Sequence, residues 1–209
     1  MLYGDNLKKY ITFSLFILIL LCACNKKDNN DFIKAKNKLN NMKSYSSLAN
    51  ITVYGNKGIS EYKVKQYCVL TDKIRIETIE PSFLKGKITV YSDGKWKVFH
   101  PLINKTFYID NLRNIDQIVY LGVIQRDLFV DKGAKYRLVK KDDKELIEIT
   151  KDIPKESEYG KEAALYIEMD NYSPIVMEII DSLQRVKVRV KYENFKYNEE
   201  LDNSIFVLE

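Results

Sequence analysis

Residues 87–101 read KITVYSDGKWKVFHP and contain the strongest folding signal of the chain. Apolar and polar side chains alternate on both sides of Asp93-Gly94, which is typical of strands with one buried face. An Asp-Gly pair between such segments favours a two-residue turn, because both central positions of that turn need a positive φ. The stretch therefore predicts a β-hairpin with strands over Lys87–Ser92 and Lys95–Phe99.

The same alternation continues on both sides of this hairpin. Short apolar runs bounded by Gly, Asn, Asp and Pro predict about nine to eleven strands joined mainly by short turns. The other predicted strands are Leu48–Tyr54, Ser60–Leu70, Ile74–Ile79, Thr106–Ile109, Lys135–Lys140, Glu145–Thr150, Ala164–Asp170, Ile175–Asp181, Val186–Tyr192 and Leu201–Ile205. The charged stretch Pro154–Lys161 contains Gly160 and predicts a loop. A sheet of this length tends to curl.

Two segments have a helical pattern instead. Asp31 fits a helix N-cap, and apolar residues follow it at helical spacing: Phe32, Ala35, Leu39 and Met42. Residues 112–131 also suit a helical or irregular segment. The expected fold class is α+β and mainly β, with one long antiparallel sheet whose apolar face is covered by an N-terminal helix and this middle segment.

The N-terminus has the order of a secretory signal peptide. Lys8 and Lys9 precede an apolar stretch from Ile11 to Leu21, which continues as Cys22-Ala23-Cys24. The stretch is too short for a permanent membrane helix, which needs roughly 20 apolar residues. A leucine, a small residue and then Cys24 resemble the lipobox of bacterial lipoproteins, so we expect cleavage before Cys24 and lipid attachment to its sulfur.

The domain organisation follows from this cleavage. We expect residues 1–23 to be a lipoprotein signal peptide, residues 24–30 to be the lipidated Cys24 and a polar tether, and residues 31–209 to be one domain. Cys22 is a poorer acceptor, because Leu21 would then hold the position before the cut. An uncleaved signal anchor is the alternative. Two acyl chains on Cys24 would hold the protein stably at the extracytoplasmic face of a membrane.

The charge pattern excludes nucleic acid as a partner. The chain has 34 Lys and Arg residues against 29 Asp and Glu, a formal net charge of +5, and the charges are interspersed. No basic block is dense enough to predict nucleic-acid binding. The lysines of the first helical segment suit a solvated face or, as an alternative, contact with anionic headgroups: Lys34, Lys36, Lys38 and Lys43.

Cysteine and histidine are scarce. Cys68 is the only cysteine beyond Cys24, so no intramolecular disulfide is expected once Cys24 carries lipid. A buried structural thiol is the simpler interpretation of Cys68, and an intermolecular disulfide is the alternative. His100 is the single histidine, which excludes a zinc site with several histidines, and its place before Pro101 fits a turn.

No motif in the chain specifies a reaction. We find no Gly-rich phosphate loop, paired-cysteine motif or nucleophile elbow. Glu77 and Glu80 could pair as acid and base, and Glu156, Glu158 and Glu162 could contact a partner, although solvated surface is the simpler interpretation of both groups. We therefore predict no catalytic, cofactor or metal site and expect a protein that is not an enzyme.

Aromatic residues are in excess, with 15 Tyr, 9 Phe and 1 Trp. Several cluster around the predicted hairpin: Tyr91, Trp96, Phe99, Phe107 and Tyr108. Core packing, a ligand cavity and a protein interface all use such residues, so composition alone does not separate these roles.

The order of these signals resembles a known fold. Arg75-Ile76-Glu77, then Pro81, then the hairpin from Val90 to Pro101 are similar to the middle of the LolA/LolB/RseB-like lipoprotein fold. The later part of the chain resembles the closing meander of that family, at Leu165-Tyr166-Ile167, Ser173–Glu178, Asp181 and Tyr192–Phe195. The resemblance covers most of residues 31–209. It implies an incomplete, strongly curved antiparallel barrel with helices on one side.

Within this group, the size and the Lys-, Asn- and Ile-rich composition resemble the GerS-like spore germination lipoproteins of clostridia. Those proteins act in making or remodelling spore cortex peptidoglycan and partner the amidase CwlD. The resemblance implies a non-catalytic lipoprotein at the spore membrane that binds and supports a CwlD-like amidase, needed for later cortex hydrolysis in germination. Any zinc ligands would then belong to the amidase.

Two classes of function stay open. An amidase partner predicts an exposed apolar or aromatic patch and a free β edge suited to pairing. A carrier or sensor of lipid, as in the wider fold family, predicts a deep apolar cavity between sheet and helices. A homodimer formed through an edge strand is compatible with either function.

Overall fold

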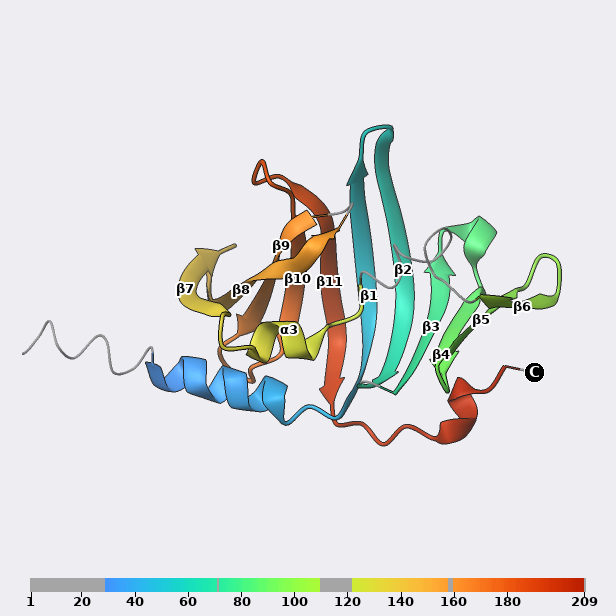
Figure 1. Ribbon diagram of the computed structural model, residues 1–209, viewed down its shortest axis with the longest axis horizontal. Helices are drawn as coiled ribbons and strands as arrows, with labels where there is room; N and C mark the ends of the chain where they lie inside the picture. The colour runs from blue at the N-terminus through green and yellow to red at the C-terminus, as the bar shows by residue number, and fades with distance from the viewer. Residues whose placement is uncertain (1–28, 71, 110–121, 158–159, 209) are drawn as a thin grey trace, which may run out of the picture.

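The computed structural model describes residues 29–70, 72–109, 122–157 and 160–208, without the side chains of residues 154–157. Their main feature is one eleven-stranded antiparallel sheet, in the order β6-β5-β4-β3-β2-β1-β11-β10-β9-β8-β7 (Figure 1). The strands are β1 (Ser44–Gly55), β2 (Gly58–Val69), β3 (Lys73–Glu80), β4 (Ile88–Ser92), β5 (Lys95–His100), β6 (Lys105–Ile109), β7 (Lys135–Lys141), β8 (Lys144–Ser157), β9 (Gly160–Glu168), β10 (Pro174–Ile180) and β11 (Val186–Tyr197).

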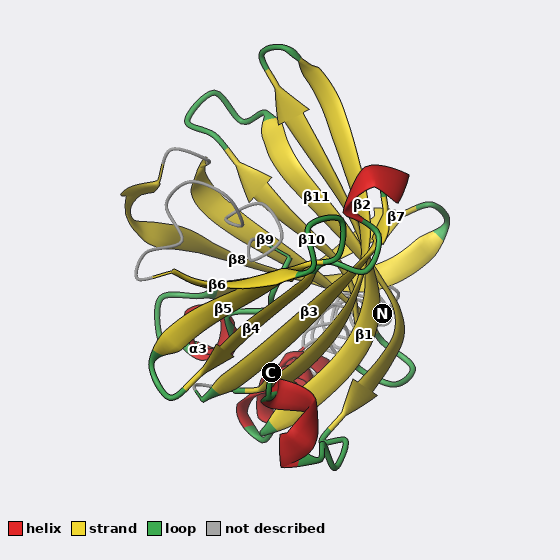
Figure 2. Ribbon diagram, turned by 90° about the vertical axis from the view of Figure 1, so that its right-hand side faces the viewer, coloured by secondary structure: helices red, strands yellow, loops and turns green. Residues whose placement is uncertain are grey.

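The sheet is strongly curved and does not close, so it ends at β6 and β7 (Figures 1 and 2). β1 pairs with both β2 and β11, which places the first and last strands side by side in the middle of the sheet. The mainly β fold with a curved, unclosed sheet is the one expected from the sequence.

The hairpin β4–β5 has the expected turn. Asp93 and Gly94 take φ values of 52° and 73°, and Tyr91 lies opposite Trp96. The same geometry recurs between β7 and β8, where Asp142 and Asp143 have φ values of 51° and 61°. Both turns are set locally, because Asp tolerates a positive φ and Gly adopts it at no steric cost.

Helical segments cover the inner face of the sheet, which we define as the face that carries the core. Residues 29–40 form a helix beneath β7–β10 (Figure 1), and its predicted apolar residues Ala35 and Leu39 are completely buried, as is Met42 just after the helix. A short helix α3 (Arg126–Val130) buries Phe129 in the same core. Fully burying a side chain of this size contributes about 1.5–3 kcal/mol.

The helix start differs from the prediction. Residues 29 and 30 are already helical, so Asp31 is not the N-cap. Asp31 instead accepts a hydrogen bond from the Tyr172 hydroxyl at 2.9 Å and lies 3.8 Å from the Lys34 ammonium. Its carboxylate therefore ties the helix to the turn before β10.

Two further predictions are wrong. Leu201–Ile205 is not a strand: η3 (Asn203–Phe206) is a 3₁₀ helix that contacts β3 and β4 and buries Phe206. Residues 154–157 belong to β8 and not to a loop, and Ser157 pairs with Gly160. The prediction for residues 112–131 is tested only from residue 122 onward, and residues 112–121 lie outside the described residues.

Candidate functional site

A buried polar network holds residues 122–124 against the inner face of the sheet. Gln66 Nε2 and the Tyr192 hydroxyl both donate to the Gly122 carbonyl, at 2.8 and 3.0 Å. The Ile124 N–H donates to the Tyr45 hydroxyl at 3.0 Å. These bonds satisfy backbone groups that a buried segment would otherwise leave unpaired. Three adjacent strands, β2, β1 and β11, thus hold this segment on one face of the sheet.

This network is neutral and tightly packed. Burial raises the pKa of Tyr45 and Tyr192 well above the ordinary value, and raises the pKa of the Cys68 thiol to about 12. A Cβ atom at Gly122 would lie 2.6 Å from Ile51 Cδ1, so a larger residue would require the buried Ile51 side chain to shift. Cys68 is buried and free, as the simpler interpretation of the sequence expected.

The segment that this network holds forms one wall of a cavity. The cavity has a volume of about 460 Å³ and is partly open to solvent. Its floor is a row of directly paired residues that crosses β2, β3, β4 and β5: Cys68, Ile74, Tyr91 and Trp96. The opposite wall comes from residues 123–128. Neighbouring strands and one pinned segment therefore build the space together.

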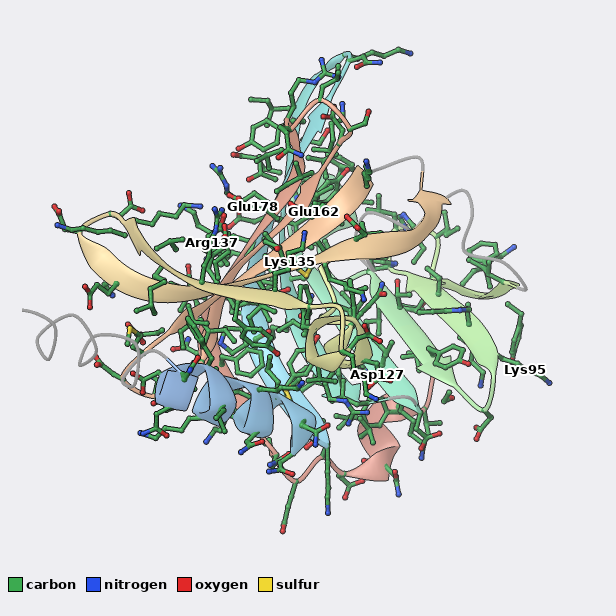
Figure 3. The ribbon with its side chains drawn as sticks, turned by 60° about the vertical axis from the view of Figure 1, so that its left-hand side comes forward. Lys95, Asp127, Lys135, Arg137, Glu162 and Glu178 are labelled. Atoms are coloured by element: carbon green, nitrogen blue, oxygen red, sulfur yellow. The ribbon has the colours of Figure 1, made fainter. Side chains whose placement is uncertain are left out.

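The rim of this cavity is polar. The Arg126 guanidinium lies 2.7 Å from Asp127 and donates to the Met42 carbonyl at 3.0 Å, so its charge is paired. Asp72 and Gln125 are exposed at the same rim. Figure 3 shows Asp127 where α3 approaches the β4–β5 hairpin. The cavity therefore combines an apolar floor with hydrogen-bonding groups at its mouth.

A second candidate site is the edge of the sheet at β6. Five exposed large apolar residues lie on this strand, on the turn before it and on η1 (Ser82–Leu84); we call them the edge patch: Phe83, Leu102, Ile103, Phe107 and Tyr108. Tyr108 and Leu102 are 69% and 73% exposed. Within the described ranges, β6 has a strand partner on one side only. Exposed apolar residues beside a free edge are typical of an interaction surface.

A third cluster lies on the outer face of β7–β11, opposite the core (Figure 3). Glu178 is buried, and it accepts hydrogen bonds from Arg189 at 2.7 Å, Lys141 at 3.1 Å and the Tyr166 hydroxyl at 3.2 Å. Burial disfavours the charged carboxylate, but the bonds from Arg189 and Lys141 outweigh it and hold the pKa of Glu178 below its ordinary value. Its bonds are satisfied within the domain, so this cluster serves stability.

The residues singled out in the sequence are not brought together. Glu77 and Glu80 lie opposite Lys65 and Lys63 in the β2–β3 register and form no acid–base pair. His100 ends β5, and its Nδ1 atom is buried without a hydrogen-bond partner. Glu162 lies on β9 opposite Ile180. Cys24 lies outside the described residues, as do the side chains of Glu156 and Glu158.

The described residues hold neither a cluster of metal ligands nor a membrane-spanning helix. Among the described residues, no three His, Cys, Asp or Glu side chains gather as a metal site would need. No helix in that part of the chain combines the length and apolar character needed to cross a membrane.

Sequence reasoning missed the Tyr45–Gln66–Tyr192 network, although a glutamine inside the apolar alternation of β2 was a signal that could have indicated it.

Comparison with known proteins gives a family. The model of the sporulation protein YdcC-like family matches residues 7–206. Sporulation protein YdcC of Bacillus subtilis (strain 168) is 21% identical over 195 residues, which are 92% of this chain and 57% of that protein. The chain therefore spans a little over half the length of this curated relative.

Solved structures agree with the fold. The GerS lipoprotein, in its complex with the CwlD amidase from Clostridioides difficile, is 26% identical with a TM-score of 0.51, over 83% of this chain and 95% of that chain. MucB is 11% identical with a TM-score of 0.52, over 88% and 63% of the two chains. A LolA superfamily protein from Nitrosomonas europaea matches at 13% identity and a TM-score of 0.44, over 87% and 97%. The structures of GerS and MucB confirm the expected resemblance to GerS and to RseB-like proteins.

Proposed function

Because the chain belongs to the sporulation protein YdcC-like family, we propose that it is a non-catalytic partner that docks onto a cell-wall amidase during spore formation. The observation that carries the proposal is the 26% identity to GerS, whose structure is known in complex with the CwlD amidase. By this proposal the catalytic groups belong to the amidase, and the protein supports the cortex hydrolysis that germination later needs.

The edge patch supplies the docking surface in this proposal. The other exposed large apolar residues are separated from one another along the chain: Ile33, Ile59, Leu183 and Val207. The edge patch places its five within residues 83–108, beside a strand whose outer edge can accept a strand of a partner. Burial of exposed Tyr and Leu side chains at the centre of an interface is a common source of affinity.

Attachment to a membrane completes the proposal. Lipid on Cys24 would place the helix of residues 29–40 near the extracytoplasmic face, because only a few residues separate the two. Two acyl chains bind a membrane far more stably than one. The amidase would then be held beside the spore membrane, where cortex is made. Mass spectrometry of the protein extracted from membranes would test for the lipid on Cys24.

The alternative, a carrier of acyl chains, has weaker support. The space between the helix of residues 29–40 and the sheet is filled by side chains such as Leu39, Met42 and Tyr45. The cavity beside α3 has a volume of about 460 Å³ and a rim that carries Asp72, Arg126 and Asp127. Burying an acyl chain against these polar groups costs free energy, because it removes them from water.

Co-elution on a sizing column tests the docking proposal. The buried core residues of the described part of the chain lie within residues 35–206, so a chain of residues 25–209 keeps them. We expect this chain to elute together with the CwlD-like amidase of the same organism at micromolar concentration. Leu102→Asp combined with Tyr108→Asp should weaken the complex about tenfold or more, because charges would face the amidase at the centre of the interface.

The matched control carries the same two changes elsewhere. Ile59 and Leu183 are 64% and 68% exposed, and Ile59→Asp with Leu183→Asp should leave co-elution unchanged. Circular dichroism checks that all variants fold. Separate elution of the wild-type chain and the amidase would overturn the proposal. A wild-type dimer that the edge variant converts to a monomer, with no amidase bound, would assign the edge patch to self-association.

A further inference from the structure

The cavity beside α3 has a lining that the docking proposal does not use. Its floor brings two aromatic rings together: the centroids of Tyr91 and Trp96 are 4.8 Å apart, and their planes are tilted by 42°. Both side chains are half-buried, so part of each remains accessible. The volume of about 460 Å³ lies within the range of small-molecule sites, roughly 300–1,000 Å³.

The polar groups of the cavity are placed around these rings. Asp72 precedes β3 and Gln125 precedes α3, and both side chains are exposed at the rim without a recorded partner in the described part of the chain. Arg126 and Asp127 neutralise each other at 2.7 Å. The Asp72 carboxylate is thus the one rim charge without a partner among the described residues, and the rim otherwise offers neutral hydrogen-bond donors and acceptors. This lining disfavours an anion and suits a neutral ligand with hydroxyl or amide groups that donate to Asp72.

The apolar floor and the polar rim together favour a sugar over an acyl chain as the ligand. An acyl chain would fit the apolar floor of Cys68 and Ile74, but it has no donor or acceptor for the rim groups of Asp72 and Gln125. A sugar ring suits both parts, because its C–H groups can pack on the electron-rich face of Trp96 or Tyr91 while its hydroxyl groups reach the rim. Acetamido groups would add a methyl group for the floor and an amide for the rim.

We propose that this cavity binds a segment of a neutral oligosaccharide, held by Tyr91 and Trp96 at the floor and by Asp72 and Gln125 at the rim. The buried network of Tyr45, Gln66 and Tyr192 keeps the opposite wall in place before the sugar arrives. Such preorganisation lowers the entropic cost of binding. The proposal does not depend on the amidase, because the rim and floor lie within this chain.

Trp96 provides a direct readout, because it is the single tryptophan of the sequence. Titration of residues 25–209 with chitotetraose should change the intensity or wavelength of its fluorescence in a saturable manner. Cellotetraose, which lacks acetamido groups, is titrated in parallel: binding of both sugars assigns recognition to the rings, and binding of chitotetraose alone assigns it to the acetamido groups. Both outcomes support the proposal.

Two variants test the named residues while Trp96 is kept as the reporter, and each variant is titrated against its own sugar-free fluorescence. Asp72→Ala with Gln125→Ala removes rim groups that are exposed in the fold, and should weaken chitotetraose binding about tenfold through the loss of hydrogen bonds. Tyr91→Ala should weaken it by a similar factor. The matched controls Asp152→Ala and Tyr108→Ala change exposed residues outside the cavity and should bind as wild type.

Three outcomes would overturn the proposal. These are no fluorescence change at millimolar sugar, equal loss of binding in the control variants, or saturable binding of palmitate in place of both sugars. The docking variant Leu102→Asp with Tyr108→Asp separates the two proposals. It should lose the amidase and keep the sugar, whereas the cavity variants should lose the sugar and keep the amidase.

Discussion

At the scale of single residues, Glu178 shows how the outer face of β10 is stabilised. Its carboxylate is buried between Arg189 and Lys141, and the Lys141 ammonium also lies 4.1 Å above the ring of Tyr166. The sequence places Glu178 at an outward position, where a solvated side chain would be expected. Long side chains from β7 and β11 cover it instead, because β10 lies inside the sheet and not at its edge.

Glu178→Gln should therefore destabilise the fold by about 2 kcal/mol at pH 7, since hydrogen bonds to a charged group contribute about 1.5–3 kcal/mol. The pKa of Glu178 is below its ordinary value of 4.5 in the folded state. Its charged carboxylate therefore stabilises the fold fully above pH 4.5, and this stabilisation is lost as the pH falls through the folded-state pKa. Urea unfolding at pH 7, 4 and 3 measures the difference between wild type and variant, which should shrink as the pH falls.

The control for this change is Glu168→Gln on β9. Glu168 pairs with Lys144, whose side chain is 65% exposed, and exposed pairs contribute only about 0–1 kcal/mol. A destabilisation by Glu178→Gln that stays constant between pH 7 and pH 3 would show that packing and not charge explains it.

At the scale of elements, the 3₁₀ helix η3 packs against β3 and β4, a role that the sequence alone did not predict. Arg75 Nη1 on β3 donates to the Ile205 carbonyl at 2.8 Å, and Lys73 Nζ donates to Asn203 Oδ1 at 3.0 Å. Phe206 is only 2% exposed, and Asp202 caps the turn by accepting from the Ser204 N–H at 2.7 Å. The C-terminal segment thus covers β3 and β4 on the face opposite the cavity.

Phe206→Ala should lower the free energy of unfolding by about 3 kcal/mol, because it removes a buried ring and leaves a cavity. Val207→Ala is the matched control: Val207 is 60% exposed, and its change should fall within about 0.5 kcal/mol. Chemical unfolding followed by circular dichroism gives both values. Equal small effects of the two substitutions would mean that η3 does not cover the sheet.

At the scale of the whole molecule, the sheet has two halves, and different segments pack against the inner face of each half. β7–β11 pack on the helix of residues 29–40, whereas β2–β5 border the cavity and β6 carries part of the edge patch. β1 and β2 connect the halves through twelve consecutive pairs, from Ser44 opposite Val69 to Gly55 opposite Gly58. This continuous ladder and the shared core favour cooperative unfolding of the domain.

Thermal unfolding should therefore give the same midpoint by two probes. Fluorescence of Trp96 reports on β5, and far-ultraviolet circular dichroism reports on all strands. Coincident transitions are the test of a two-state domain. An earlier fluorescence transition would show that β3–β6 unfold separately from the rest.

The sequence by itself determined the features that depend on neighbouring residues. Alternation predicted most strands, Asp93-Gly94 predicted its turn, and helical spacing placed Ala35 and Leu39 in the core. These patterns are local, because a strand shows its two faces every second residue and a helix shows one face about every 3.6 residues. The mainly β, curved fold followed from their order and from family resemblance.

Only the tertiary structure decided what depends on distant partners. Residues 154–157 became part of a strand by pairing with β9, and residues 203–206 became a 3₁₀ helix because β3 and β4 offered a surface to cover. The Tyr45–Ile124 bond and the row from Cys68 to Trp96 join segments far apart in sequence. Short windows of sequence carry propensity and polarity, but a free edge or a cavity exists only once the sheet order is fixed.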